Sequence, residues 1–586
     1  MFEAQTEWIS PESFPDLKDH KYIAIDLETR DPNLKSRGSG SLIGEGEIVG
    51  ISVAVEGWSG YYSFGHKEGN FFDEVVVMRW IKDVCALPNV KLFHNAMYDV
   101  CWLRAYGVKI NGHIVDTMVM ASLVDENRFW YSLNSLSLDY LGQVKDETAL
   151  RAAADKAGID AKSEMWKLPA MYVGSYAEKD AELTLALFKK LSKEIKLQDL
   201  TKVFDLETQL FPCLIDMKFK GVRVDVEAAH KLKTRLIAQE EQALQEVKKE
   251  TGEDVQIWAA RSIAKVFDKH TTFIDTIIKY QYKGRIHADI NPIRGDSGGT
   301  VTGRFSYSNP NLQQVPARNK ELGPMIRSLF IPENDHKWGC FDYSQQEPRL
   351  VVHYAATKFK GDEEVVEIVE RFQNNTVDFH QTVADMANIS RTQAKTINLG
   401  LFYGMGKAKL QAELGLSTKE EASKLFNKYH DSVPFVKDLM DAISRDGQAF
   451  GYIKTFGGRK CRFNKWEIAE WNAGNFKPPM SKADAEAAYF EKYPKAKKAN
   501  IRRAMTYKAL NKLIQGSAAD MTKQSMLDLY REGIVPHIQI HDELDISVES
   551  PQQAKKIIEI MENAVKLKIP NKVDYESGDN WGEING

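Results

Sequence analysis

Two periodicities of hydrophobic positions along the chain predict where its strands and helices lie. Short apolar runs, some alternating with polar residues, predict strands at residues 21–30, 46–55, 60–65, 90–94 and 338–342 and a hairpin at 537–548. Apolar residues at helical spacing predict helices at residues 95–107, 115–125, 175–191, 226–250 and 391–404. With 586 residues, this order predicts a multidomain chain of α/β and α+β architecture.

The helix predicted at residues 391–404, with the sequence RTQAKTINLGLFYG, places four side chains along one broad face. They follow one another at steps of four: Arg391, Lys395, Leu399 and Tyr403. Two cations stand at one end of this face and an aromatic ring at the other. A nucleoside triphosphate has the same order of phosphates and base, and Arg and Lys both bind phosphate. The alternative is an ordinary amphipathic helix with a solvated basic end.

Acidic residues gather near predicted element ends in the first two hundred residues. Asp26 and Glu28 lie two apart in the first strand, so their side chains point the same way. Asp99 follows a strand-to-helix junction, and Tyr176 and Asp180 share one face of a later helix. Each feature alone also fits a solvated strand end or surface helix chemistry. Together, the carboxylates can converge on two metal ions while the phenol orients a water, as two-metal phosphodiester hydrolysis requires.

The ordered motifs DxE, NxxxYD and YxxxD resemble those of the proofreading 3′–5′ exonucleases of the ribonuclease-H-like superfamily. Asn95, just before the helix that carries Asp99, also fits a plain N-cap. The resemblance covers about residues 20–195 and implies a ribonuclease-H-like fold. It also implies a catalytic Tyr176 and four metal ligands: Asp26, Glu28, Asp99 and Asp180.

A second pair of carboxylates lies 200 residues apart in the sequence, at the tips of predicted strands. Asp342 ends the strand at 338–342, and Asp542 stands at the turn of the hairpin. If the two tips are neighbours, these side chains could hold two Mg²⁺ ions about 4 Å apart. Ser344 and Glu347 fit a capping box, which is the structural alternative for Glu347.

Five motifs in the second part of the chain resemble those of the family A DNA polymerases, the relatives of bacterial polymerase I and many phage replicases. In order, they are TGRFSYSNPNLQQVP, DYSQQEPR, RTQAKTINLGLFYG, ALNKLIQGSAAD and HDE. The resemblance covers about residues 200–586. It implies a right-hand fold of palm, thumb and fingers, template-directed DNA synthesis with proofreading, and a role in phage DNA replication. An exonuclease in front, without a 5′-nuclease domain, resembles the phage arrangement.

The resemblance also implies roles for single residues. Asp342 and Asp542 become the catalytic metal ligands, helped by the backbone of Tyr343. Lys395 becomes the general acid that protonates the leaving pyrophosphate. The implied dNTP-binding residues are Arg391, Lys395, His380, Leu399, Tyr403 and Glu347, and the implied DNA-binding residues are Arg304, Asn511, Gln515 and His541.

Three positions depart from the family pattern. Gln346 replaces a usually apolar residue, and Pro348 replaces a usual Leu, which the first turn of a helix tolerates. Leu399 stands where the family usually has Phe or Tyr against the incoming sugar. We expect altered sugar discrimination or rate, because every charged catalytic position is present.

The motif order implies an exonuclease domain at residues 1–200 and a polymerase domain at 201–586. The expected subdomains are the palm at 201–225, 290–352 and 517–586, the thumb at 226–289, and the fingers at 353–516. The helical thumb could grip duplex phosphates without reading sequence, or its helices could merely pack on their neighbours.

Composition narrows the expected partners. The net charge of −4 gives no general basic surface, so DNA must bind in local grooves. The five scattered cysteines suit a reducing compartment. No apolar run has the length of a signal peptide or a membrane span. We expect a monomer in the cytoplasm, or the host cytoplasm if phage-encoded, that binds primer–template DNA and dNTPs but no membrane. Helicase or processivity partners are not identifiable.

The expected cofactors are two Mg²⁺ ions at each site, which Mn²⁺ could replace. Three other functions fit less well. A dedicated exonuclease would lack Asp342 or Asp542, and a single-subunit RNA polymerase is disfavoured by the exonuclease motifs and Glu347. A non-catalytic DNA-binding protein is disfavoured by the acidic pI of 6.4 and the full set of carboxylates.

Overall fold

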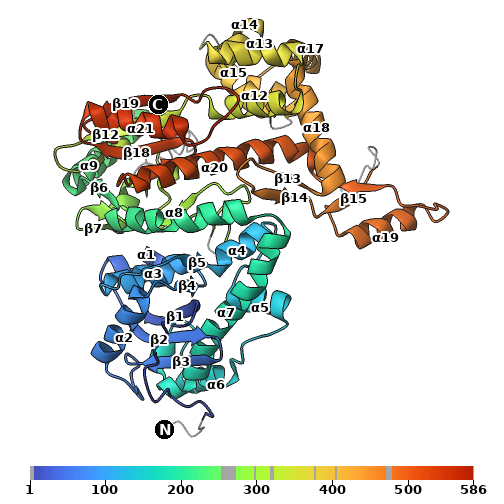
Figure 1. The fold of residues 1–586 in the computed structure, drawn as a ribbon. Helices are drawn as coiled ribbons and strands as arrows, with labels where there is room; N and C mark the ends of the chain where they lie inside the picture. The colour runs from blue at the N-terminus through green and yellow to red at the C-terminus, as the bar shows by residue number, and fades with distance from the viewer. Residues whose placement is uncertain are drawn as a thin grey trace.

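The first and second parts of the chain lie one above the other, with helix α8 (Thr201–Lys220) between them (Figure 1). The computed structural model describes residues 6–251, 272–295, 298–316, 322–374, 378–387, 389–402, 405–469 and 478–584. Among the described residues, no helix combines the length and the apolar character that a membrane crossing needs.

A five-stranded sheet with the order β3-β2-β1-β4-β5 forms the centre of the first part. Its strands are β1 (Tyr22–Arg30), β2 (Glu47–Val55), β3 (Trp58–Ser63), β4 (Val90–Phe93) and β5 (Ile114–Asp116). β1 runs antiparallel to β2 and parallel to β4, and both of its faces are largely buried. The helices of this part are α1 (Leu34–Arg37), α2 (Glu74–Ala86), α3 (Ala96–Ala105), α4 (Thr117–Val124), α5 (Leu133–Leu141), α6 (Thr148–Ala157) and α7 (Gly174–Leu197). The predicted α/β architecture is confirmed.

Helix α8 (Thr201–Lys220) contributes to both hydrophobic cores. Leu210 and Leu214 pack into the core of the second part, whereas Phe211 and Ile215 pack into the core of the first part. Residues four apart share a helix face, so the two pairs point to different partners. The helix ends at Gly221, whose φ of 61° favours glycine, and the chain then enters β6 (Val222–Val224).

The palm is built on an antiparallel sheet with the order β17-β18-β12-β19. These strands are β17 (Ile538–Ile540), β18 (Glu543–Val548), β12 (Lys337–Tyr343) and β19 (Val573–Gly578), and α20 (Ala509–Arg531) and α21 (Pro551–Asn563) pack against them. Smaller strands around this core are β7 (Gln281–Tyr282), β8 (Arg285–Ile286), β9 (Asp289–Asn291), β10 (Ser306–Ser308) and β11 (Phe330–Ile331), with helix α11 (Leu322–Arg327). The predicted hairpin at 537–548 is present as β17 and β18.

The fingers form a second helical core, drawn in yellow and orange in Figure 1. Their helices are α12 (Gln346–Lys358), α13 (Glu363–Gln373), α14 (Phe379–Ala387), α15 (Arg391–Phe402), α16 (Lys407–Leu414), α17 (Lys419–Ser432) and α18 (Pro434–Phe450). Beyond them, β13 (Tyr452–Lys454) and β14 (Lys460–Arg462) form one hairpin, and β15 (Trp466–Ile468), α19 (Lys482–Lys492) and β16 (Ile501–Arg503) form a projection. The helix predicted at 391–404 is α15, but Tyr403 and Gly404 lie outside the described residues.

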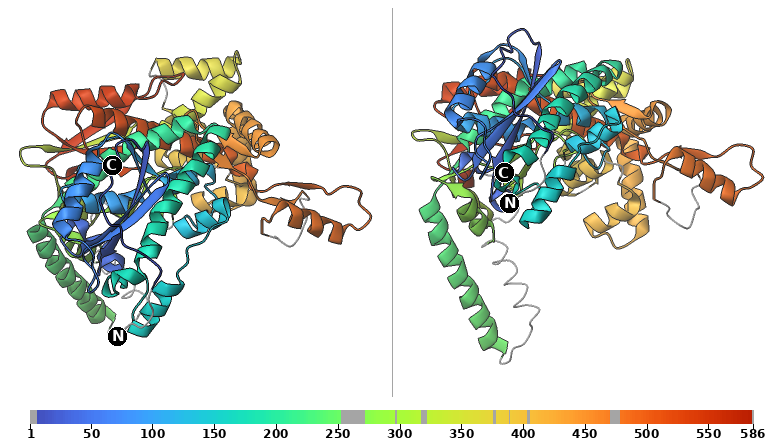
Figure 2. Two further views of the ribbon diagram at one scale, coloured as in Figure 1. Left: turned by 60° about the horizontal axis from the view of Figure 1, so that its bottom comes forward. Right: turned by 90° about the horizontal axis from the view of Figure 1, so that it is seen from below.

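The long helix predicted at 226–250 is present as α9 (Val226–Thr251). Figure 2 shows α9 standing out from the body in the view from below. Residues 256–270 of the expected thumb, whose apolar positions also have helical spacing, lie outside the described residues.

Candidate active sites

Three carboxylates of the first part lie close together at the middle of its sheet. Asp26 and Glu28 share one side of β1, and Asp180 approaches them from α7. One oxygen from each of the three lies within 4.8 Å of the others. Glu28 and Asp180 are buried, so the sequence motifs on two distant elements form one concentrated acidic cluster.

Asp99 is fixed beside this cluster through the backbone of β1. Its Oδ1 accepts a hydrogen bond from the Leu27 N–H at 3.1 Å, between Asp26 and Glu28 in the chain. Three of the predicted metal ligands of the exonuclease therefore form one cluster, and Asp99 bonds to the strand that carries two of them. The carboxylate oxygens form the donor set that hard divalent cations prefer, so these residues fit such an ion.

The start of α3, which presents Asp99, differs from the sequence prediction. Asn95 adopts a left-handed conformation with φ of 66° and makes no side-chain cap. Instead, Asp116 accepts hydrogen bonds from the N–H groups of Asn95 and Ala96 at 3.0 and 2.8 Å. Asp116 also caps α4 through the Met118 N–H at 2.8 Å. One buried carboxylate thus anchors two helix starts, a contact that the order of residues did not reveal.

Burial strongly perturbs the pKa values of the exonuclease carboxylates. It raises the pKa of Asp26 well above its ordinary value, and the negative charge of Asp180 adds to this rise. The pKa of Glu28 is raised well above its ordinary value by burial and by its acidic neighbours. Lys145 opposes both shifts. This lysine, whose ammonium pairs with Asp180, could not be recognised from the sequence motifs.

The two predicted catalytic aspartates of the palm are brought together by strand pairing. Asp342 lies opposite Glu543 in the β12–β18 register, and the Tyr343 N–H donates to the Asp542 carbonyl at 3.3 Å. His541, with φ of 57°, forms the turn that carries Asp542. Adjacent strand tips therefore place two carboxylates side by side, as the pattern of strands predicts.

The palm carboxylates also hold protons more tightly than free aspartates do. Burial, and then the charge of Asp542, raises the pKa of Asp342 to about 8. Burial, and then the charge of Glu347, raises the pKa of Asp542 to about 6. Lys395 of α15 opposes the shift of Asp342, so the fingers helix faces the palm aspartates.

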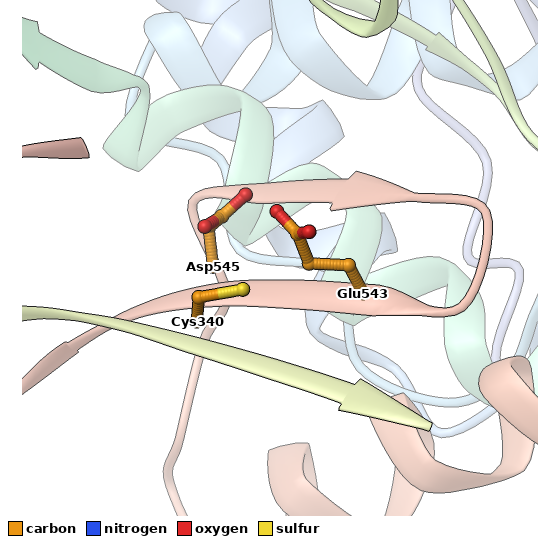
Figure 3. A group of neighbouring side chains, drawn as sticks. All are labelled: Cys340, Glu543 and Asp545. Carbon is orange, nitrogen blue, oxygen red and sulfur yellow. The ribbon is translucent and has the colours of Figure 1, made fainter. Parts of the chain in front are cut away.

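The Glu543 side chain lies next to those of Asp545, on the same strand, and Cys340, on the neighbouring strand β12 (Figure 3). Their ligand atoms lie within 4.8 Å of one another. Asp545 is fully buried and accepts from the Trp338 indole at 2.8 Å. Its Oδ2 and the Oε1 of Glu543 are buried without a hydrogen-bond donor among the described residues. Burial, reinforced by Glu543, raises the pKa of Asp545 well above its ordinary value.

Glu347 does not form the predicted capping box. Helix α12 begins at Gln346, and its N-cap residue Gln345 is left-handed with φ of 53° and no side-chain cap. Ser344 therefore lies one residue too early to cap the helix. Glu347 instead pairs with Arg304, with 2.7 Å between Oε1 and Nη2.

The predicted phosphate-binding residues lie on α14 and α15. Arg391 is held by Asp378, with 2.7 Å between Nε and Oδ2. His380 is buried with its Nδ1 3.0 Å from the Asn398 amide nitrogen, and burial lowers its pKa to about 4. Lys395 is exposed. Nothing is described of the Leu399 side chain or of Tyr403.

The remaining predicted residues lie around the palm. Asn511 and Gln515 are one turn apart on α20, so they share a face. The buried Tyr343 hydroxyl lies 2.5 Å from both Ser525 Oγ and the Met561 carbonyl, which anchors the end of β12. Two of the positions that depart from the family pattern are also described. Gln346 is buried with its amide nitrogen 3.4 Å from the Thr522 hydroxyl, and Pro348 lies in the first turn of α12.

Comparisons with known proteins agree with this geometry. Residues 186–583 match the family model described as DNA polymerase family A, and residues 4–196 match the model described as 3′–5′ exonuclease. A DNA-directed DNA polymerase of Pseudomonas phage M6 is 32% identical, with 99% of this chain and 97% of the relative covered. DNA polymerase DpoZ of Salmonella phage PMBT28 is 26% identical, with 97% and 98% covered.

The fold also resembles that of a solved structure, the POL domain of Pol1 from M. smegmatis in complex with a DNA primer-template and dNTP. The TM-score is 0.71 at 20% sequence identity, and 96% of each chain is covered. The family match spans most of the chain, and the acidic sites lie in the matched regions. This chain therefore belongs to DNA polymerase family A and is a DNA-directed DNA polymerase with a 3′–5′ exonuclease domain.

Proposed function

We propose that Asp342 and Asp542 hold two Mg²⁺ ions, which Mn²⁺ could replace, for nucleotide addition to a primer 3′-OH. The observation that carries this proposal is the pairing of β12 with β18, which sets the two carboxylates at adjacent strand tips. The backbone carbonyl of Tyr343 is the third proposed ligand. When bound, such ions lower the pKa of the 3′-OH and offset the charge of the triphosphate.

The proposed work of the fingers is to hold the triphosphate and supply a proton. Arg391 and His380 hold its phosphates, and Arg391 exchanges the carboxylate of Asp378 for phosphate when the nucleotide arrives. Lys395 contacts the phosphates and gives a proton to the leaving pyrophosphate as the 3′-oxygen attacks the α-phosphorus. Leu399, Tyr403 and Glu347 border the sugar.

The proposed DNA contacts lie on the palm side. Arg304, Asn511, Gln515 and His541 contact the primer–template duplex at its growing end. Donors in the minor groove meet acceptors that are similar in all four base pairs, so these residues test pair geometry without requiring a sequence.

The proposed exonuclease site uses two further Mg²⁺ ions, held by the convergent carboxylates Asp26, Glu28, Asp99 and Asp180. Tyr176, buried beside Asp180, orients the attacking water. Water attacks the terminal phosphodiester, the bond from phosphorus to the 3′-oxygen breaks, and the leaving oxygen takes a proton.

The proposed biological role is replication of a phage genome in the cytoplasm of an infected host, which the phage relatives support. The proposed substrates are primer–template DNA and dNTPs, and the proposed state is a monomer. The division at residues 200 and 201, with its palm, thumb and fingers boundaries, stays a prediction, although residue 200 falls between α7 and α8.

Two variants of the full chain test these assignments. In primer extension with Mg²⁺, we expect Asp342→Ala to stop synthesis and to leave primer degradation. We expect Asp26→Ala to do the reverse. Extension by Asp342→Ala at the wild-type rate would remove this residue from the polymerase site.

A further inference from the structure

One buried lysine stands inside the exonuclease site. Lys145 lies between α5 and α6, and only 8% of its side chain is exposed. Its ammonium forms an ion pair with Asp180. The same nitrogen lies 3.4 Å from the Tyr176 hydroxyl and 4.6 Å from the centre of the Tyr176 ring. Lys145 thus contacts one proposed metal ligand and the residue proposed to orient water.

This ion pair is distinctive among the contacts of the site. Within the described part of the chain, no other ion pair reaches Asp26, Glu28, Asp99 or Asp180. Burying an ammonium costs several kcal/mol of desolvation that a single ion pair offsets only in part. A Leu or Met side chain would fill the same space without that cost. The negative charge of the clustered carboxylates explains why a buried ammonium is favourable here.

We propose that Lys145 is a further catalytic residue of the exonuclease: its ammonium offsets the carboxylate charge before a divalent cation binds, and then contacts the scissile phosphate. This inference rests on the proposed exonuclease site. The ammonium and a divalent cation compete for Asp180, so cation binding frees Lys145 from that carboxylate. Its long, flexible stem lets the charge move to a neighbouring anion, and the phosphodiester of the primer end is the anion that this site receives.

During hydrolysis, the freed ammonium can stabilise the negative charge that develops on the phosphate. As water attacks phosphorus and the bond to the 3′-oxygen breaks, negative charge grows on the phosphate oxygens and on the leaving oxygen. A cation placed there stabilises the transition state more than the ground state. One proton of the water ends on the 3′-oxygen, and the other passes to solvent, so Lys145 need not lose its own proton.

Replacement of Lys145 should separate this role from a merely structural one. Lys145→Met keeps the length of the stem and removes the charge, and we expect turnover of single-stranded primer to fall by about 100-fold. Lys145→Arg keeps the charge and should recover much of that loss. The matched control is Lys18→Met, because Lys18 pairs with Asp16 at the surface with 63% of its side chain exposed. The control should degrade primer at the wild-type rate.

A second readout does not depend on activity. Mn²⁺ binding is followed by electron paramagnetic resonance on the full chain with Asp342→Asn and Asp542→Asn, which remove the proposed polymerase ligands. Without its competitor at Asp180, the Lys145→Met form should bind Mn²⁺ several-fold more tightly at the exonuclease site. Melting temperatures of all variants check that the fold is kept.

The possible outcomes distinguish this inference from the proposed site itself. If Asp26→Ala still degrades primer, the exonuclease site is wrong. If Asp26→Ala is inactive while folded Lys145→Met degrades primer like the wild type, only the role of Lys145 is overturned. The role of Lys145 is also overturned if Lys145→Arg degrades primer as slowly as Lys145→Met, or if Lys145→Met binds Mn²⁺ with unchanged affinity.

Discussion

Arg304 and Glu347 form an ion pair beside Asp542, with 2.7 Å between Nη2 of the guanidinium and Oε1 of the carboxylate. The two side chains come from the loop before β10 and from the first turn of α12. Their proposed roles are different, since Arg304 contacts DNA and Glu347 borders the sugar of the nucleotide. In this structure each side chain therefore holds the other in place.

This pair leads to a prediction about sugar selection. In Glu347→Ala the space beside the sugar opens, and we expect discrimination against ribonucleotides to fall by about tenfold or more, since one such contact contributes about 1–3 kcal/mol. The measurement is the ratio of single-turnover rates for rNTP and dNTP. Glu549→Ala, an exposed carboxylate, is the control. Unchanged discrimination would remove Glu347 from the sugar site.

A buried charge network joins α8 to the polymerase core. Glu207 accepts from Arg459 at 2.6 Å and from Lys523 at 2.7 Å, and Arg459 also donates to Asp520 at 2.8 Å. All four side chains are at least 95% buried. Burial raises the pKa of Glu207, but the positive charges of Lys523 and Arg459 outweigh burial and hold this pKa below its ordinary value.

We expect Glu207→Ala to destabilise the polymerase part by about 3–5 kcal/mol, because it leaves the buried Lys523 without its carboxylate partner and leaves Arg459 with Asp520 alone. Glu532→Ala is the matched control, since Glu532 pairs with Lys556 in an exposed position and should cost about 1 kcal/mol or less. The measurement is the urea midpoint of each variant. Equal midpoints would contradict the importance of the network.

The raised pKa values of the palm aspartates predict a dependence on pH. Between about pH 4 and pH 8 the folded chain keeps a proton on Asp342 that the unfolded chain has lost, so this group's contribution to stability is lost as the pH rises. A divalent cation needs the deprotonated carboxylates, so its binding should release protons and tighten from pH 6 to pH 8.

Calorimetry of Mg²⁺ binding in two buffers of different ionisation enthalpy measures this proton release. Asp342→Asn is the control and should release fewer protons. Binding at the palm with the same affinity at pH 6 and pH 8 would show that the aspartates are already ionised.

Leu399 supports a prediction about chain terminators. Leu399→Tyr brings a hydroxyl that can replace the hydrogen bond lost when the nucleotide has no 3′-OH, so we expect easier incorporation of 3′-deoxy terminators. Leu399→Phe has the ring without the hydroxyl and should show the smaller effect. Relative incorporation is read from terminated products on a primer ladder, and identical ladders for all three forms would place Leu399 away from the sugar.

The sequence predicts best what depends on local pattern. Alternating residues on both sides of Asp542, and the apolar run before Asp342, locate the strand tips of the palm. The four exonuclease carboxylates follow from their ordered motifs in the same way. For Asp342 and Asp542 local patterns suffice because the end of β12 pairs with the start of β18. Asp99 and Asp180 lie on helices α3 and α7 and were assigned from motif order.

Contacts between distant segments could not be predicted in this way. Lys145 reaches Asp180, and Asp116 bonds the backbone of Asn95, across segments whose packing no local pattern records. The prediction of a capping box at Ser344 and Glu347 was wrong, because a left-handed Gln345 shifts the start of the helix by one residue. Asp545 was not recognised because it occupies an inward position where an apolar residue is the ordinary expectation.

The most direct test of the central claim is anomalous diffraction from crystals of the full chain with Mn²⁺, primer–template DNA and a non-hydrolysable dNTP. We expect anomalous peaks between Asp342 and Asp542 and at the cluster of Asp26, Glu28 and Asp180. A well-ordered nucleotide with no peak between Asp342 and Asp542 would contradict it.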